Sequence, residues 1–295
     1  MNISKLFQKT EEKEFTTFPR TLETYAWYKP ILIIAIAFIV TTVVTFALMS
    51  IVGIDPRKDN IIQLIYTAIS MIATIPAVYI ANKLLYKIPF STQVAPIRKW
   101  DWSIYIKAFI ITLLVYAIFQ GFQIFAIGGS ISFNVPIVIL LLCIILPIFQ
   151  GFAEEFAFRG LFMQTLGSWF GIPAVAIFLQ AALFAVAHRY VLFALISVLC
   201  TGLLYGFIVW YGQGLEVSSA MHAVNNIFSF LAIALGLQGR ATGISEISLL
   251  GNLFLLIVPI IIVLLLDKKF NLFGVDSGGI LNFPISIFLI NQIND

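Results

Sequence analysis

The sequence contains few charged residues, few cysteines and few histidines, and each shortage excludes a class of protein. Charged side chains make up 11% of the 295 residues, whereas hydrophobic side chains make up 61%. A water-soluble domain needs more polar surface than this, so the composition indicates an integral membrane protein. The net charge is only +3, and no basic cluster is present that would bind nucleic acid.

The two cysteines, Cys143 and Cys200, lie in apolar runs without CxxC spacing. They are expected to behave as small buried hydrophobic residues, which excludes a disulfide framework and a thiolate metal site. Residues 1–29 also lack the apolar core and small-residue cleavage site of a secretory signal. Because lysines and glutamates alternate there, we predict that residues 1–29 form a retained, solvated cytoplasmic tail.

Long apolar segments follow this tail. A helix that crosses about 30 Å of hydrocarbon needs about 20 mostly apolar residues. Eight segments meet this criterion and predict an all-α, polytopic membrane domain over residues 30–266, followed by a C-terminal tail over 267–295. Counts of seven or nine stay open, because residues 135–170 have room for one span plus a partly embedded helix. The predicted spans are residues 30–53, 61–82, 104–127, 135–153, 172–190, 191–211, 216–236 and 248–266.

The basic residues predict the orientation of these spans. Lysine and arginine collect in the N-terminal tail, in the 83–102 loop and after the last span, and basic loops usually stay cytoplasmic. With eight spans, all three regions fall on the same side. We therefore predict a multi-pass plasma-membrane protein with both termini in the cytoplasm, and its short loops are typical of a prokaryotic protein.

Gly202 and Gly206 have the small-xxx-small spacing that lets membrane helices approach each other closely. The spacing predicts close helix packing at this position. Packing within the chain and packing between two chains both satisfy the pattern.

Glu154 and Glu155 lie next to each other inside an apolar segment. A charged group in such a segment costs about 2.5 to 3.5 kcal/mol, so its presence indicates a functional or structural role. On a helix, Glu155 and Arg159 share a face and can form an ion pair. Glu154 is rotated by about 100° and points elsewhere, so it is free to act as a general acid or base. The alternative is a buried ion pair that only holds helices together.

The two histidines of the chain, His188 and His222, also lie in apolar segments. His188 is near the end of its span, where an imidazole can simply mark the interface. His222 and Asn226 share a helical face, and such residues also bridge packed helices without catalysis. Taken together with Glu154, these residues offer a base, a second proton-handling group and two oxyanion donors, which suffice for attack of water on a peptide carbonyl.

These residues resemble the motifs of the CAAX-protease and bacteriocin-processing family of intramembrane endopeptidases, also called the Abi or CPBP family. The family pattern is EExxxR, FxxxH and HxxxN on successive helices, and the match covers about residues 135–236 here. The resemblance implies that Glu154 and His188 activate water, that His222 and Asn226 stabilise the oxyanion, and that Glu155 and Arg159 support the site. The matching positions are Glu154-Glu155-xxx-Arg159, Phe184-xxx-His188 and His222-xxx-Asn226.

The resemblance also bears on cofactors and on access to the site. The family has been described as metal-dependent, and glutamate and histidine can ligate Zn²⁺, but no HExxH motif is present. The cofactor is therefore unknown: a metal-free glutamate mechanism is favoured, and Zn²⁺ stays the alternative. The resemblance further implies a conical cavity that opens to the cytoplasmic side.

The leading hypothesis is an intramembrane endopeptidase that hydrolyses a membrane-associated peptide or protein in the lipid bilayer. Bacteriocin or peptide processing and self-immunity are the expected roles. One alternative is a CAAX-prenyl protein endopeptidase. Others are a non-catalytic transporter or immunity protein, or a structural scaffold, in which the same polar residues bind a ligand or stabilise the fold.

Overall fold

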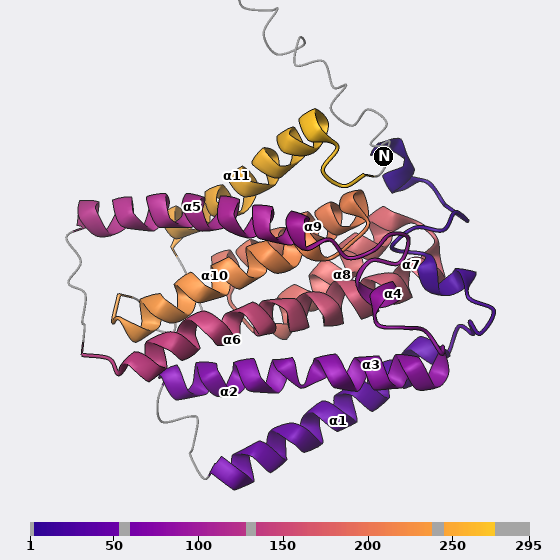
Figure 1. The fold of residues 1–295 in the computed structure, drawn as a ribbon, viewed down its shortest axis with the longest axis horizontal. Helices are drawn as coiled ribbons and strands as arrows, with labels where there is room; N and C mark the ends of the chain where they lie inside the picture. The colour runs from indigo at the N-terminus through magenta and orange to yellow at the C-terminus, as the bar shows by residue number, and fades with distance from the viewer. Residues whose placement is uncertain (1–2, 53–59, 128–133, 238–244, 275–295) are drawn as a thin grey trace, which may run out of the picture.

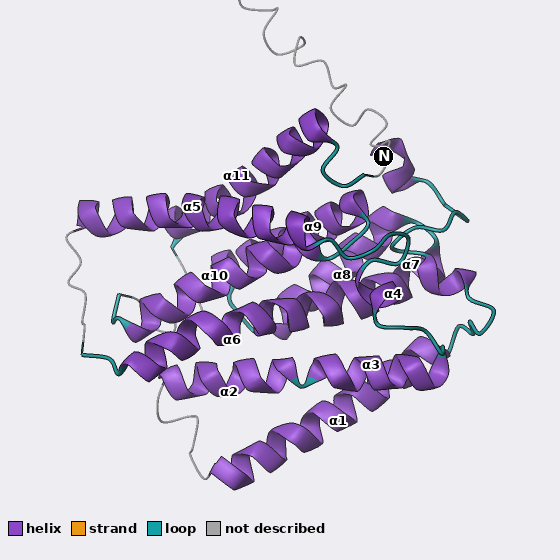
Figure 2. Cartoon of the chain, viewed as in Figure 1, coloured by secondary structure: helices purple, strands orange, loops and turns teal. Residues whose placement is uncertain are grey.

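The computed structural model describes residues 3–52, 60–127, 134–237 and 245–274 of the chain (Figure 1). Within these ranges every regular element is a helix, as Figure 2 shows. The predicted all-α, polytopic architecture is therefore confirmed. Most of the predicted C-terminal tail lies outside the described residues.

Seven helices in the described part of the chain are long and apolar enough to cross a membrane. The remaining predicted span, over residues 172–190, is an apolar helix of only 15 residues, α8. It follows the positive-φ residue Gly171, which ends the preceding helix, and it starts at Pro173. The long elements are α1 (Lys29–Val52), α2 (Asn60–Ile72) with α3 (Thr74–Leu85), α5 (Trp102–Ile127), α6 (Ile137–Glu155), α9 (Leu192–Gly212), α10 (Glu216–Ala234) and α11 (Glu246–Phe270); the shorter ones are η1 (Ile3–Phe7), η2 (Phe18–Thr21), α4 (Ser91–Val94), η3 (Phe156–Met163), α7 (Gln164–Phe170) and α8 (Pro173–Ala187).

The run from residue 135 to residue 170 does not divide into a span and a separate embedded helix. Instead α6, the π-helix η3 and α7 form one continuous helix of 34 residues, Ile137–Phe170. At 1.5 Å per residue it is about 50 Å long, which exceeds the roughly 30 Å of bilayer hydrocarbon. The π-helix begins directly after the two glutamates.

Successive long helices run in alternating directions, so the N-terminal segment, the α3–α5 connection and the turn between α9 and α10 gather at one end of the bundle, at the right in Figure 1. We call it the basic end, because most of the basic loops lie there. Backbone contacts hold its parts together. The Thr10 amide donates to the Gly171 carbonyl (2.8 Å), and the Leu215 amide donates to the Val94 carbonyl (3.0 Å).

Residues 14–19 contradict the prediction of a fully solvated tail, because all six are buried. Phe15 is 0% exposed, and its amide donates to the Gln213 side chain (2.6 Å) in the α9–α10 turn. Glu14 accepts hydrogen bonds from Trp210 (3.1 Å) and Thr16 (2.6 Å). Charged residues surround Phe15 and Phe18 in the sequence and led to the prediction of a solvated tail. In the structure these two side chains pack into the basic end of the bundle.

Glu14 makes the anchoring of this segment depend on pH. Burial raises the pKa of the Glu14 carboxyl above its ordinary value, despite the hydrogen bonds from Thr16 and Trp210. A raised folded-state pKa means that the stabilising contribution is complete below the unfolded pKa and is lost as pH rises through the folded pKa. We expect tryptic cleavage after the exposed Lys13 to accelerate with pH more in the wild type than in Glu14→Gln. Parallel pH profiles of the two cleavage rates would contradict this.

Gly202 and Gly206 pack α9 against α8 within the chain. A Cβ atom on Gly202 would lie 2.8 Å from the Cα and Cβ atoms of Ala181, and one on Gly206 would lie 2.7 Å from the Gln180 amide nitrogen. The structure thus uses the small-xxx-small pair for an intramolecular contact. The close approach leaves the Gly202 carbonyl within reach of side chains on neighbouring elements.

Candidate active site

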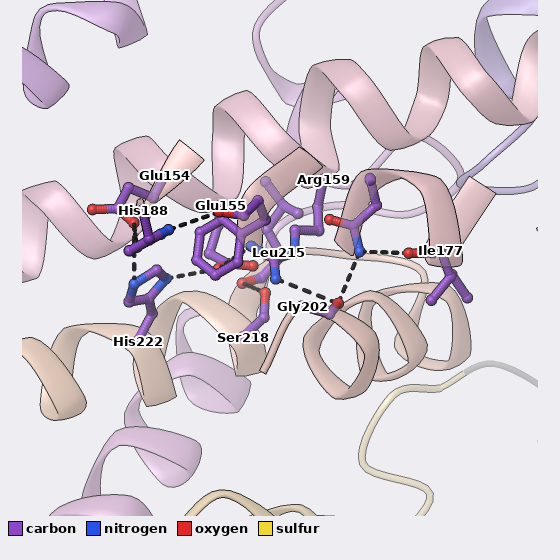
Figure 3. A network of polar contacts seen from close by, with 11 residues as sticks. Glu154, Glu155, Arg159, Ile177, His188, Gly202, Leu215, Ser218 and His222 are labelled. Atoms are coloured by element: carbon purple, nitrogen blue, oxygen red, sulfur yellow. Dashed lines mark hydrogen bonds and ion pairs between the residues drawn. The ribbon is translucent and has the colours of Figure 1, made fainter. Parts of the chain in front are cut away.

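Glu154 and Glu155 end α6 and point in different directions, as predicted from their rotation on a helix (Figure 3). Glu155 and Arg159 are both 0% exposed. Their side chains form the predicted ion pair, with Arg159 Nη1 2.9 Å from Glu155 Oε1. Arg159 lies in the π-helix η3, which begins immediately after the two glutamates. Such π-helical segments are often found at functional sites.

Aromatic rings enclose the buried guanidinium of Arg159. Its centre lies 4.6 Å from the Phe184 ring centroid and 5.6 Å from that of Tyr205, and Nη2 donates to the Gly202 carbonyl at 3.4 Å. These contacts compensate a cation held away from water. The Phe184 ring also lies edge-on to both imidazoles, with centroid distances of 4.5 Å to His188 and 5.9 Å to His222. Phe184 therefore packs against Arg159 and both histidines of the site.

His222 bridges the two glutamates from α10. Its Nδ1 lies 2.8 Å from Glu155 Oε1, and its Nε2 lies 3.4 Å from Glu154 Oε2. Because Glu155 is paired with Arg159 and accepts hydrogen bonds, His222 Nδ1 carries a hydrogen and donates it. Nε2 is then the ring nitrogen that faces Glu154 (Figure 3).

His188 approaches Glu154 from the C-terminal end of α8. Its Nδ1 lies 2.7 Å from the Phe184 carbonyl, which can only accept, so Nδ1 carries a hydrogen there as well. The opposite nitrogen, Nε2, lies 4.0 Å from Glu154 Oε2. Glu154 Oε1 accepts from Gln150 at 3.0 Å, which leaves Oε2 facing both imidazoles.

Exposure increases across the site away from the basic end. Ser218 and Ser219, which precede His222 on α10, are 0% exposed, whereas the His188 side chain is 26% exposed. Asn226, one turn beyond His222, is half-buried. The site is therefore more exposed on the side of His188 and Asn226 than on the side of the basic end.

Asn226 is placed differently from the other motif residues. It shares the α10 face with His222, but its Oδ1 accepts from the neighbouring Asn225 Nδ2 at 3.1 Å. The structure thus brings Glu154, Glu155, Arg159, His188 and His222 into one network and leaves Asn226 one helical turn along from it.

Gly151 is a site residue that was not predicted from the sequence. A Cβ atom there would lie 2.7 Å from the Ala223 amide nitrogen and 3.1 Å from its Cα. Glycine thus lets α6 approach α10 directly beside His222. A small residue three positions before Glu154 was the available signal, since small residues permit close helix approach in membranes.

We expect Gly151→Ala to separate α6 from α10 by several tenths of an ångström and to weaken the contacts of His222 with both glutamates. Overpacking of this kind costs about 1 to 3 kcal/mol, and a small misplacement at a site can lower the rate about a hundredfold. Gly121→Ala is the matched control, because no heavy atom lies within 4 Å of a Cβ atom there. Equal activity of the two variants in a peptide-cleavage assay would contradict the prediction.

Three side chains of the candidate site are potential ligands of a metal ion. Glu154, His188 and His222 supply one carboxylate and two imidazoles, a donor set that zinc accepts elsewhere. In the described residues, however, no group of three or more histidine, cysteine, aspartate or glutamate side chains is arranged to hold a metal ion. The described arrangement of these three side chains therefore does not fit a metal ion.

The chain is similar to known proteins over part of its length. An uncharacterized protein, YyaK, of Bacillus subtilis is 28% identical over 184 residues, which cover 58% of this chain and 61% of that protein. No solved structure matches the chain. Residues 136–228 match the Rce1-like family, described as type II CAAX prenyl endopeptidase Rce1-like. This segment contains all six motif residues, so the resemblance of the chain to the CAAX-protease and bacteriocin-processing family is confirmed over residues 136–228.

Proposed function

We propose that the protein is a glutamate-dependent intramembrane endopeptidase. The observation that carries the proposal is the convergence of Glu154 Oε2 with the Nε2 atoms of two imidazoles, at 3.4 Å and 4.0 Å, in the segment that matches the Rce1-like family. A carboxylate next to two proton-handling groups is suited to deprotonating water.

The proposed first step uses Glu154 and His188. Glu154 accepts a proton from a water molecule, and the oxygen attacks the carbonyl carbon of the scissile peptide bond. Neutral His188 has its lone pair on Nε2, because Nδ1 donates to the Phe184 carbonyl, so it accepts a hydrogen bond from the second hydrogen of the same water, which stays on the attacking oxygen. Glu154 then passes its proton to the leaving amine as the C–N bond breaks.

The proposed oxyanion donor His222 needs a hydrogen on Nε2. Since Nδ1 already donates to Glu155, Nε2 carries a hydrogen only in the doubly protonated imidazolium. Charge balance supports that form, because Glu154 and Glu155 bring two negative charges and Arg159 neutralises one of them. The Asn226 amide supplies the second donor in this scheme.

The proposal requires no metal ion, and removal of metals tests this point. Activity that survives dialysis against a strong chelator, with metal content measured on the same sample, supports water activated by Glu154 and His188 without a metal ion. Loss of activity that returns with added Zn²⁺ would favour the zinc alternative.

The substrate is proposed to be a membrane-associated peptide or protein, and the basic end is proposed to face the cytoplasm of a prokaryotic cell. Three exposed tryptophans support an interface at that end, since tryptophan concentrates at membrane surfaces. They are Trp27 and Trp102, next to the first turns of α1 and α5, and Trp169 in the last turn of α7.

Processing of bacteriocin-type or other peptides, or self-immunity, is the proposed role. Cleavage of a prenylated CAAX tail is the second candidate, which the description of the matching Rce1-like family favours. A panel of peptides distinguishes them: a farnesylated CAAX peptide, its unmodified form and apolar leader peptides, each incubated with the protein in liposomes. Mass spectrometry of the products identifies the substrate class and the scissile bond. Uptake without cleavage would favour the transporter reading.

A further inference from the structure

Two hydrogen bonds connect helix α5 to Asn226. The hydroxyl of Tyr116 donates to Asn225 Oδ1 at 3.0 Å, and Asn225 Nδ2 donates to Asn226 Oδ1 at 3.1 Å. Asn225 stands at an unspecified position of the HxxxN motif, and Tyr116 lies outside the segment that matches the Rce1-like family. Neither residue is used in the mechanism above.

Packing fixes the position of the Tyr116 hydroxyl. The Tyr116 side chain is 7% exposed and forms a small apolar cluster with Val224 of α10 and Leu255 of α11. Its ring also lies 5.3 Å from that of Phe228, one turn beyond Asn225 on α10. A buried tyrosine hydroxyl needs an acceptor, and the Asn225 carbonyl oxygen supplies it.

The direction of these hydrogen bonds decides which end of the Asn226 amide is free. A carboxamide has an oxygen that accepts and a nitrogen that donates, so a donor at one end fixes the orientation of the next amide in the chain. Tyr116 turns the Asn225 oxygen toward α5, and the Asn225 nitrogen then holds the Asn226 oxygen. The Asn226 nitrogen, with its two hydrogens, remains available. The opposite orientation would present an oxygen to the oxyanion and repel it.

We propose that Tyr116 and Asn225 are positioning residues that hold Asn226 with its NH₂ group available to the oxyanion. This inference rests on the proposed endopeptidase function and extends it to helix α5. A donor that is oriented before the reaction contributes more to transition-state stabilisation than one that must rotate into place. A hydrogen bond that only joins two membrane helices would contribute to stability alone.

The test measures kcat and KM for Tyr116→Phe in liposomes with a peptide that the wild type cleaves. Loss of a direct oxyanion donor costs about 10² to 10³ in rate, so loss of its orientation is expected to lower kcat about tenfold with little change in KM. Asn225→Asp is expected to lower kcat as well, because an ionised carboxylate still accepts from Tyr116 but cannot donate to Asn226.

Tyr66→Phe is the matched control. The Tyr66 hydroxyl also joins two membrane helices, α2 and α1, since it donates to the Thr45 carbonyl at 2.7 Å, and neither residue belongs to the candidate site. We expect this variant to keep the wild-type kcat. An equal fall of kcat in both tyrosine variants would overturn the proposal, because it would assign the effect to general helix packing.

The decisive measurement repeats Tyr116→Phe in an Asn226→Ala background. If Tyr116 acts through Asn226, the second substitution causes no further loss of kcat. A full additional loss would overturn the positioning role, as would wild-type kcat in Tyr116→Phe alone. A wild type that cleaves no peptide of the panel would instead refute the endopeptidase function, and the positioning role would fall with it.

Discussion

Glu154→Gln is expected to lower peptide cleavage about a hundredfold to ten-thousandfold while the protein stays folded. The amide keeps the size of the side chain, and it can still pair with Gln150 after rotation, but it cannot accept a proton from water. Because Glu155 and Arg159 form the buried ion pair separately, the substitution leaves that pair intact. The measurement is kcat/KM in liposomes, with the thermal unfolding transition recorded on the same sample.

Glu246→Gln is the matched control for Glu154→Gln. Glu246 is an exposed residue in the first turn of α11, and the same chemical change there should leave the rate at the wild-type value. Wild-type cleavage by a folded Glu154→Gln protein would refute the role of Glu154 as the base. Retention of a transport or protective activity in that variant, without any cleavage by the wild type, would favour the non-catalytic alternative.

Arg159→Met is expected to lower the free energy of unfolding by about 3 to 5 kcal/mol, the typical cost of leaving one charge of a buried pair without its partner. Glu155 is 0% exposed and would keep only His222 as a charged neighbour. The Arg159 contacts with Phe184, Tyr205 and the Gly202 carbonyl would be lost as well. Equilibrium unfolding in mixed micelles measures the difference.

Removing both charges of the pair separates stability from function. In Glu155→Gln with Arg159→Met no charge of the pair is left uncompensated, so we expect most of the lost stability to return. Cleavage should remain low, because a neutral glutamine no longer favours the imidazolium form of His222. A double variant that regains both stability and activity would show that Glu155 is only structural.

Much of the candidate site was predictable from the spacing of a few polar residues. Glu155 and Arg159 are four positions apart, which places them on one helical face, and their ion pair is observed at 2.9 Å. The adjacent position of Glu154 predicted its different direction for the same reason. The enclosure of Arg159 by Phe184 and Tyr205 was not predictable, because Tyr205 lies on a helix whose packing is not encoded in the motif spacing.

The sequence was a weaker guide to the ends of the bundle. Residues 14–19 look solvated in the sequence because charges surround them, yet Phe15 and Phe18 are buried there at 0% and 3% exposure. Hydropathy predicted a full-length span over 172–190, where α8 has 15 residues. Apolar composition reports how well a segment tolerates burial, and it does not report which surface covers it.

The sequence by itself determined that this is a helical membrane protein with one buried cluster of proton-handling residues. Hydrophobic length and the cost of charge in a bilayer lead to that conclusion without knowledge of contacts. Only the tertiary structure decided that His222 bridges both glutamates, that Gly151 brings α6 against α10, and that Tyr116 reaches Asn226 through its neighbour. Periodicity specifies the face of one helix, whereas these contacts depend on how two helices approach and rotate against each other.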